Sequence, residues 1–338
     1  MSKKLKLLST FLMLCSVLSC APKPDTPQVI IYTALDEMYS APILDAFEAK
    51  TGIEVVPVYD TESSKTTGLV NRLIAEKDRP RADVFWNNEV IQTIVLKNKG
   101  LLEVYVSPSS APLPAAFKDS EGYWAGIAAR GRVIIYNTDL VSDPPQSIHD
   151  LLDPTWRGKA AIAKPLFGTT ATHGASLFAL WGPEKAKAFF QGVKDNDIAV
   201  LPGNSTVRDL VARGEYAWGL TDTDDANGAV VDGFPVKWIF PDQGEGQDGT
   251  LIIPNTVALI KNAPHKDAAQ QLIDYLLSPE VEEILAQSRS LQIPLHPEAH
   301  APEAVPVLSE IRTCAIDFED AAQHLDASMR YMQEEFLK

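Results

Sequence analysis

The segment Tyr216-Ala217-Trp218-Gly219-Leu220-Thr221-Asp222-Thr223-Asp224-Asp225-Ala226 joins a strand pattern to a group of carboxylates. Large apolar residues alternate with small ones in its first half, as in a strand that is packed on its faces. Its second half holds three aspartates within four positions, and a short helical pattern follows. In open α/β sheets, ligands bind at the carboxyl edge of the strands. The segment therefore predicts a strand that carries polar side chains to a binding site.

An alternative is that these aspartates only cap the following helix. Aspartate is favoured at the N-cap and in the first turn of a helix. One cap needs one carboxylate, whereas this segment offers three. We therefore expect Asp224 and Asp225 to face a ligand, and Asp222 is the best candidate for a cap.

The first 19 residues have the pattern of a targeting segment. Three lysines precede an apolar run at residues 7–18 that is too short to cross a bilayer stably, and small residues precede Cys20. Val17-Leu18-Ser19-Cys20 resembles the bacterial lipobox, in which the cysteine is lipidated and becomes the new N-terminus. We expect a signal peptide at residues 1–19 and a proline-stiffened lipidated tether at residues 20–27.

Charge and cysteine content exclude several classes of partner. The formal net charge is −15, and removal of the lysine-bearing leader makes the chain more acidic. Such a chain is a poor partner for nucleic acid or anionic lipid. Beyond the leader only Cys20 and Cys314 remain, so no cysteine-based metal site is expected. The length of 338 residues predicts about two domains.

Strand and helix patterns alternate from residue 29 onward. Strand patterns at 29–33, 53–58 and 82–86 are separated by helix patterns at 41–52 and from residue 63 onward. Gly52 follows the first helix, as is typical of a helix C-terminus. This order predicts an α/β fold with mostly parallel sheets and covering helices.

Several motifs resemble the extracellular solute-binding proteins of ABC importers, with the ferric-iron-binding periplasmic branch most similar. They include residues 47–55 (Phe-Glu-Ala-Lys-Thr-Gly-Ile-Glu-Val), 82–86 (Ala-Asp-Val-Phe-Trp), 131–137, 152–159 (Leu-Asp-Pro-Thr-Trp-Arg-Gly-Lys), 214–217 and 268–278. The resemblance covers nearly the whole mature chain. It implies a two-lobe periplasmic-binding-protein fold with a ligand cleft between the lobes. Two segments of small and then β-branched residues, 126–136 and 251–260, are candidate crossings between the lobes. We expect residues 28–128 with 255–338 to form lobe 1, and 129–254 to form lobe 2.

Polar residues at strand ends and helix starts are the candidate ligand contacts. They are Asp36, Glu37, Ser64, Asn88 and Glu89 in the first lobe, Arg130 and Tyr136 beside the first crossing, and Thr169, Thr170 and Thr172 in the second lobe. The aspartates at 222, 224 and 225 are the candidate metal ligands, because hard cations prefer carboxylate oxygens. His173 is more typical of a packed histidine than of a ligand.

One departure from the family pattern leaves the ligand open. The tyrosine pair that holds ferric iron in the family falls on Asp224 and Asp225. One reading is iron(III) or another divalent or trivalent cation, bound with a synergistic anion. The other is a phosphonate, sugar phosphate or other charged organic solute, because the threonines at 169, 170 and 172 begin a helix and helix N-termini bind anions.

A carboxylate-dependent hydrolase is the third alternative, since paired carboxylates serve acid–base catalysis. The sequence shows no nucleophile elbow, no phosphate-binding glycine motif and no metal-hydrolase histidine pair. We therefore expect no enzyme and no cofactor. We expect a lipid-anchored periplasmic monomer that delivers its ligand to an ABC permease in the inner membrane.

Overall fold

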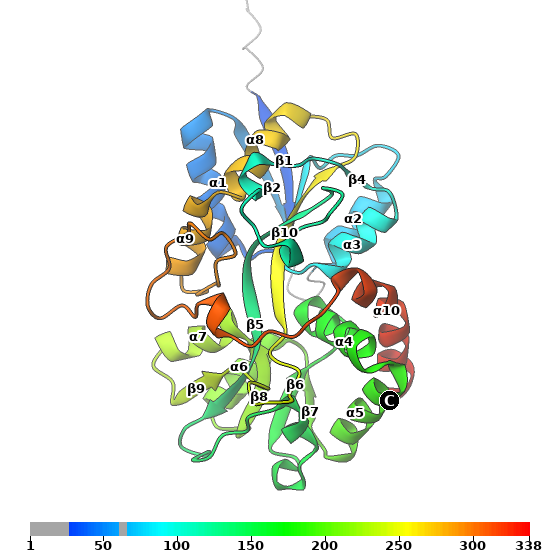
Figure 1. The fold of residues 1–338 in the computed structure, drawn as a ribbon, viewed down its shortest axis with the longest axis vertical. Coiled ribbons are helices and arrows are strands. Elements are labelled where there is room, and N and C mark those ends of the chain that lie inside the picture. Colours follow the sequence, from blue (N-terminus) through cyan, green and yellow to red (C-terminus); the bar gives the residue numbers. More distant parts are fainter. Residues whose placement is uncertain (1–26, 61–65) are drawn as a thin grey trace, which may run out of the picture.

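Two groups of parallel strands, joined by two long antiparallel strands, form the framework (Figure 1). The computed structural model describes residues 27–60 and 66–338, so Cys20 and Ser64 lie outside the described residues. The strands run in the order β2-β1-β3-β10-β5-β8-β6-β7, with β4 paired to β10 and β9 paired to β5. This arrangement confirms the predicted two-lobe α/β class.

The first lobe is built on β1 (Gln28–Thr33), β2 (Glu54–Tyr59) and β3 (Val84–Asn87), with β1 parallel to both others. The short strand β4 (Leu102–Glu103) pairs with β10. Helices α1 (Glu37–Thr51), α2 (Thr67–Ala75), α3 (Ile91–Asn98), α8 (Lys266–Leu276) and α9 (Pro279–Gln287) cover this sheet. The first helix begins four residues before the predicted start, with Pro42 inside it. It ends as predicted, at Gly52 with φ of 72°.

The second lobe is built on β6 (Ala160–Ala163), β7 (Ala199–Leu201) and β8 (Trp218–Asp222), with β6 parallel to both neighbours. The strand β9 (Val236–Ile239) pairs with β5. Helices α4 (Gly168–Trp181), α5 (Pro183–Asp195), α6 (Asn204–Ala212) and α7 (Thr223–Val231) cover this sheet. The strand predicted from the segment at 216–226 is therefore β8, and the helix that follows it is α7.

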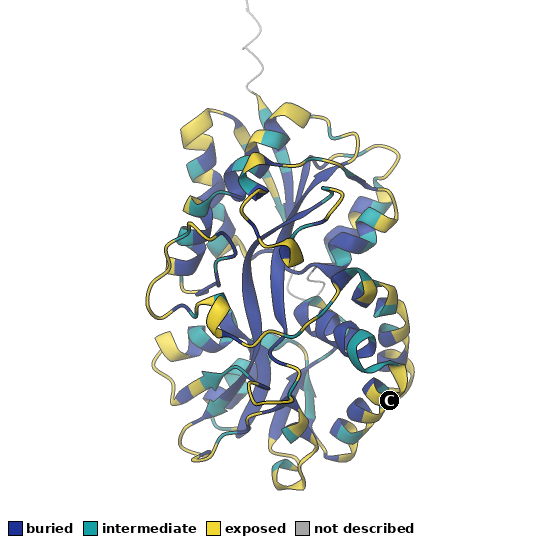
Figure 2. Ribbon diagram, viewed as in Figure 1, coloured by how far each residue is buried: buried dark blue, intermediate teal, exposed yellow. Residues whose placement is uncertain are grey.

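The strands β5 (Ala125–Asn137) and β10 (Ile252–Ile260) pass side by side from one lobe to the other (Figure 1). They coincide with the two predicted crossing segments. Nearly every residue in them is buried, as Figure 2 shows. Continuous burial explains why most of their residues are apolar and do not alternate with polar ones. Arg130, Arg132 and Asn255 are polar residues that are buried within them.

Alternate residues of each strand enter hydrophobic clusters on opposite faces of the sheet. Ile31 belongs to the cluster under α1, α8 and α9, whereas Tyr32 belongs to the cluster under α2 and α3. In the second lobe Ile134 packs with α4 and α5, and Ile135 packs with α6 and α7. Each lobe therefore has a core on both faces of its sheet.

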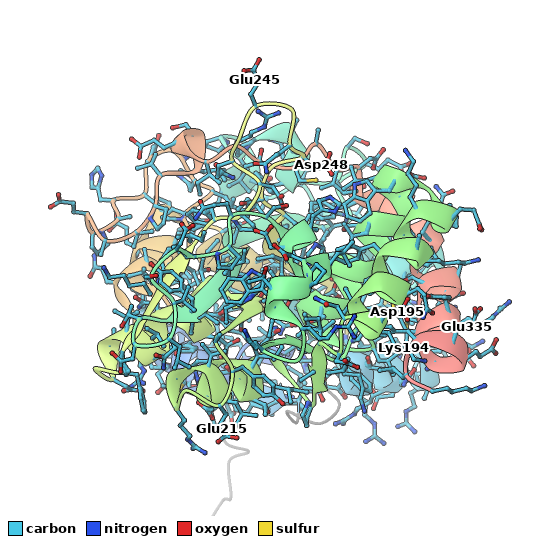
Figure 3. The ribbon with its side chains drawn as sticks, turned by 90° about the horizontal axis from the view of Figure 1, so that it is seen from below. Lys194, Asp195, Glu215, Glu245, Asp248 and Glu335 are labelled. Carbon is cyan, nitrogen blue, oxygen red and sulfur yellow. The ribbon has the colours of Figure 1, made fainter. Side chains whose placement is uncertain are left out.

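The C-terminal helix α10 (Phe318–Tyr331) contacts both lobes. Phe318 and Leu325 pack in a first-lobe cluster, whereas Met332 and Phe336 of the following π-helical turn pack in a second-lobe cluster. Lys194 of α5 donates a hydrogen bond to the Glu335 carbonyl at 3.0 Å, which ties the end of the chain to the second lobe (Figure 3). The expected lobe boundaries stay a prediction. They assign α10 to the first lobe, and the C-terminal segment packs against both lobes.

Within residues 27–60 and 66–338, no helix combines the length and the apolar character that a membrane span requires.

Candidate functional site

A cavity of about 670 Å³ lies between the lobes. The first lobe contributes Asp36 and Asn88, which follow β1 and β3, and Tyr39 in the first turn of α1. The second lobe contributes the starts of α4, α6 and α7. The cavity therefore lies at the carboxyl edges of the parallel strands, where α/β sheets bind ligands.

Asp222 ends β8 and is held in a buried ion pair with Arg132 of β5. The carboxylate Oδ1 lies 2.6 Å from Arg132 Nη1, and both side chains are almost completely buried. The second oxygen accepts hydrogen bonds from Thr169 Oγ1 at 2.5 Å and Asn204 Nδ2 at 2.9 Å. Asp222 occupies the N-cap position of α7, but its side chain makes no capping hydrogen bond there. The expected cap is thus replaced by an ion pair.

The other two aspartates also face guanidinium groups. Asp224 Oδ2 lies 3.2 Å from Arg130 Nη1, and Asp225 Oδ1 lies 3.7 Å from Arg208 Nη1. One oxygen from each of the three aspartates lies within 4.8 Å of the others. The carboxylates therefore come as close together as a metal site requires, but each one has an arginine beside it.

In the second lobe, the N-termini of α4, α6 and α7 open onto the cavity. In these three helices of the described chain, no N-cap side chain accepts a hydrogen bond from the first turn. Phe167 and Gly203, at two of these caps, have no side-chain acceptor at all. The first N–H groups of a helix have no intrahelical partner and carry partial positive charge, so an anion is favoured at such ends.

The charges that line the cavity balance. The acidic side chains are Asp36, Asp222, Asp224 and Asp225, and the basic ones are Arg130, Lys164, Arg208 and Arg289. Thr169 and Thr170 add hydroxyl groups at the start of α4, and Thr170 donates to Asn204 Oδ1 at 3.1 Å. This cavity can satisfy both an anionic group and a hydrogen-bond donor on one small ligand.

Four of the predicted ligand contacts do not line this cavity. Glu89 and Thr172 hydrogen-bond to each other at 2.7 Å across the lobes. Glu89 also accepts from the N–H groups of Ile91 and Gln92, so it caps α3 instead of facing a ligand. Burial raises the pKa of this carboxyl group, which its hydrogen bonds oppose.

The other two predicted contacts that do not line the cavity are Tyr136 and Glu37. Tyr136 packs against the second-lobe core because its position on β5 is far along the strand from the crossing. Glu37 is exposed in the first turn of α1 and does not line the cavity. The other described candidates line the cavity, and their role in binding stays a prediction.

Sequence reasoning missed three arginines, one lysine (Lys164) and one asparagine of the site. Arg132 follows Arg130 by two positions in the predicted crossing strand, and residues two apart in a strand share a face. Asn204 begins α6 shortly after β7, and Arg208 lies one turn further along this helix. A helix start that follows a strand is the same signal that indicated the other helix starts. Arg289 follows α9, far from any strand end, and no sequence signal placed it at the cavity.

Comparison with known proteins gives consistent matches. The profile of a family described as bacterial extracellular solute-binding protein matches residues 43–312. Iron uptake protein A1 of Synechocystis is 26% identical over 292 residues, which cover 80% of this chain and 79% of that protein. A putative 2-aminoethylphosphonate-binding periplasmic protein of Salmonella typhi is 24% identical over 84% of both chains. The crystal structure of iron-bound HitA from Pseudomonas aeruginosa matches with a TM-score of 0.81 at 25% identity, covering 90% of this chain and 99% of that one.

Proposed function

The chain belongs to the bacterial extracellular solute-binding protein family, and from this premise we propose that it captures a small charged solute between its lobes and delivers it to an ABC permease. It is a binding protein and not an enzyme. We propose that it acts as a monomer in the periplasm and that the lobes close on the ligand.

The pairing of every aspartate in the cluster with an arginine carries our choice of ligand class. A metal ion bound to these oxygens would add a cation about 4 Å from each guanidinium group, where repulsion between unit charges is about 4 kcal/mol at an effective dielectric constant of 20. An anion at the uncapped helix starts gains from the same charges. We propose a phosphonate or phosphate ester that also carries an amine or hydroxyl group.

Ferric iron is the second candidate, and the spacing of the three carboxylate oxygens favours it. Relatives named for iron uptake and ferric iron binding support the same reading. In this case the aspartates bind the metal, and the arginines with the threonines at the start of α4 hold a synergistic anion.

Thermal shift measurements with aspartate variants separate the two candidates. We expect 2-aminoethylphosphonate or a sugar phosphate to raise the melting temperature of the wild type, since a ligand that binds only the folded state stabilises it. Asp224→Ala and Thr170→Ala should both lose this response, because one removes a contact for the amine and the other a contact for the anion. Asp195 is exposed and does not line the cavity, so Asp195→Ala serves as the control and should keep the wild-type response.

Two outcomes would overturn the organic ligand. Ferric citrate could raise the melting temperature of the wild type and the Thr170→Ala variant but not of Asp224→Ala, which favours iron. Every response could instead survive both substitutions, which places the ligand elsewhere.

Lobe closure predicts a change in shape. A bound solute that contacts both lobes should draw them together about β5 and β10, because hinges are a few residues that absorb backbone rotation. Small-angle X-ray scattering with a saturating concentration of the stabilising solute should show a smaller radius of gyration than the unliganded protein. An identical radius in both states contradicts closure.

The lipid anchor rests on the sequence motif alone, because Cys20 lies outside the described residues. We propose that Cys20 carries a diacylglycerol group, which provides the two acyl chains that stable anchoring requires. Cys20→Ala should move the protein from the membrane to the soluble periplasmic fraction, as followed by immunoblotting. A wild-type protein without lipid mass in intact mass spectrometry contradicts the assignment.

A further inference from the structure

The pairing between the two crossing strands has an irregularity at Ala128 of β5. Along their antiparallel pairing, Pro254 lies opposite Ala129 and Asn255 lies opposite Ile127, so Ala128 is an extra residue without a partner. Ala128 has φ of 44°, which is uncommon for a residue with a side chain. One extra residue in one strand of an antiparallel pair is a β-bulge, and it bends the strand locally.

A buried carboxylate supports this bulge. Glu282 of α9 is 1% exposed, and its Oε1 accepts a hydrogen bond from the Ala128 N–H at 2.6 Å. Its Oε2 accepts from the N–H groups of Leu295 at 2.8 Å and His296 at 2.6 Å. Glu282 therefore holds the bulge and the segment after α9 in one arrangement.

A buried asparagine links the same bulge to the cavity. Asn255 Nδ2 donates to the carbonyl groups of Ile127 at 2.9 Å and Ala128 at 3.2 Å, and to Gln292 Oε1 at 2.7 Å. Its Oδ1 accepts from Arg130 Nη2 at 2.8 Å. The other terminal nitrogen of Arg130 faces Asp224 in the cavity.

We propose that Asn255 and Glu282 are positioning residues that couple the ligand cavity to the bulge between the lobes. A ligand that binds Arg130 or Asp224 changes the position of the guanidinium group. Asn255 then moves with the guanidinium group and shifts the carbonyl groups of Ile127 and Ala128 at the bulge. Glu282 holds the bulge in its unliganded conformation through the Ala128 N–H. The proposal rests on the proposed function, because the bulge accommodates the rotation of the lobes when they close on the ligand.

Amide hydrogen exchange in the unliganded protein tests this coupling without knowledge of the ligand. We expect Glu282→Gln to speed exchange of the Ala128 amide about 10-fold. The single carbonyl oxygen of the glutamine can keep the bonds from Leu295 and His296, whereas its NH₂ group cannot accept from Ala128. Glu280→Gln is the matched control on the same helix, because Glu280 is exposed and pairs with Lys50 at 2.9 Å. It should leave these amides unchanged.

A double-mutant cycle distinguishes coupling between Arg130 and Asn255 from separate structural effects of each residue. Arg130→Met should speed exchange of the Ala128 amide about 10-fold when Asn255 is present and less than about 2-fold in the Asn255→Ala background. Equal effects of Arg130→Met in both backgrounds overturn the coupling, as does an unchanged Ala128 amide in Glu282→Gln. If Glu282→Gln does not fold, the cycle between Arg130 and Asn255 decides alone.

The two proposals fail separately. A protein that binds no phosphonate or phosphate ester contradicts the proposed ligand but leaves the exchange result intact. Conversely, additive effects at Arg130 and Asn255 contradict the coupling even if a ligand is found.

Discussion

Asp222→Ala should destabilise the folded protein by about 3–5 kcal/mol, the range for breaking a buried ion pair by removing one partner. The substitution leaves the Arg132 guanidinium buried without its carboxylate. Two of its nitrogens, Nε and Nη2, already lack a hydrogen-bond partner among the described residues. Urea unfolding at neutral pH measures the loss. A helix cap would cost only about 1 kcal/mol.

Two further variants make this result specific to the ion pair. Asp232→Ala removes a carboxylate at the other end of α7 that pairs with Arg289 at the surface, and it should cost less than about 1 kcal/mol. Combining Asp222→Ala with Arg132→Met should recover part of the loss, because no buried charge is then left unpaired. A cost of about 1 kcal/mol for Asp222→Ala, with no recovery in the double variant, contradicts the ion-pair account.

His173→Gln should make the protein more resistant to acid. Burial, together with the nearby Arg132 guanidinium, lowers the pKa of His173 to about 3. The unfolded chain binds a proton at this histidine near pH 6.5, whereas the folded chain does not. The folded state therefore loses stability as the pH falls from about 6.5 towards about 3, by about 1.4 kcal/mol per pH unit.

The measurement compares urea unfolding of the wild type and His173→Gln between pH 8 and pH 4. At pH 8 both side chains are neutral, so the difference between the two proteins there reports packing alone. By pH 4 the comparison should shift by about 3 kcal/mol in favour of the glutamine variant. Parallel stability profiles over this range contradict a neutral buried His173.

Strand ends could be predicted from the sequence because their signal is local. The alternation before Asp222 predicted β8, and the aspartates that follow it indeed lie at the cavity. Glu89 also follows a strand, but it does not line the cavity. Its side chain turns back to cap α3 and meets Thr172 from the other lobe, and only the packing of the lobes brings these two residues together.

The charge partners could not be predicted for the same physical reason. Arg132 and Asp222 are 90 positions apart and meet because β5 pairs with β8 in antiparallel register. The three carboxylates therefore look like a bare acidic cluster in the sequence, whereas the structure pairs each with an arginine. This pairing is the reason that we propose an anionic organic solute rather than a metal ion as the ligand.

The proposed ligand class is tested most directly by analysing the protein as it is purified from a bacterial periplasm without chelator. Native mass spectrometry reports the mass that stays with the folded chain, and elemental analysis of the same sample reports phosphorus and iron. We predict one equivalent of a phosphorus-containing organic solute for each chain and no stoichiometric metal. One equivalent of iron without an organic phosphorus compound contradicts the account.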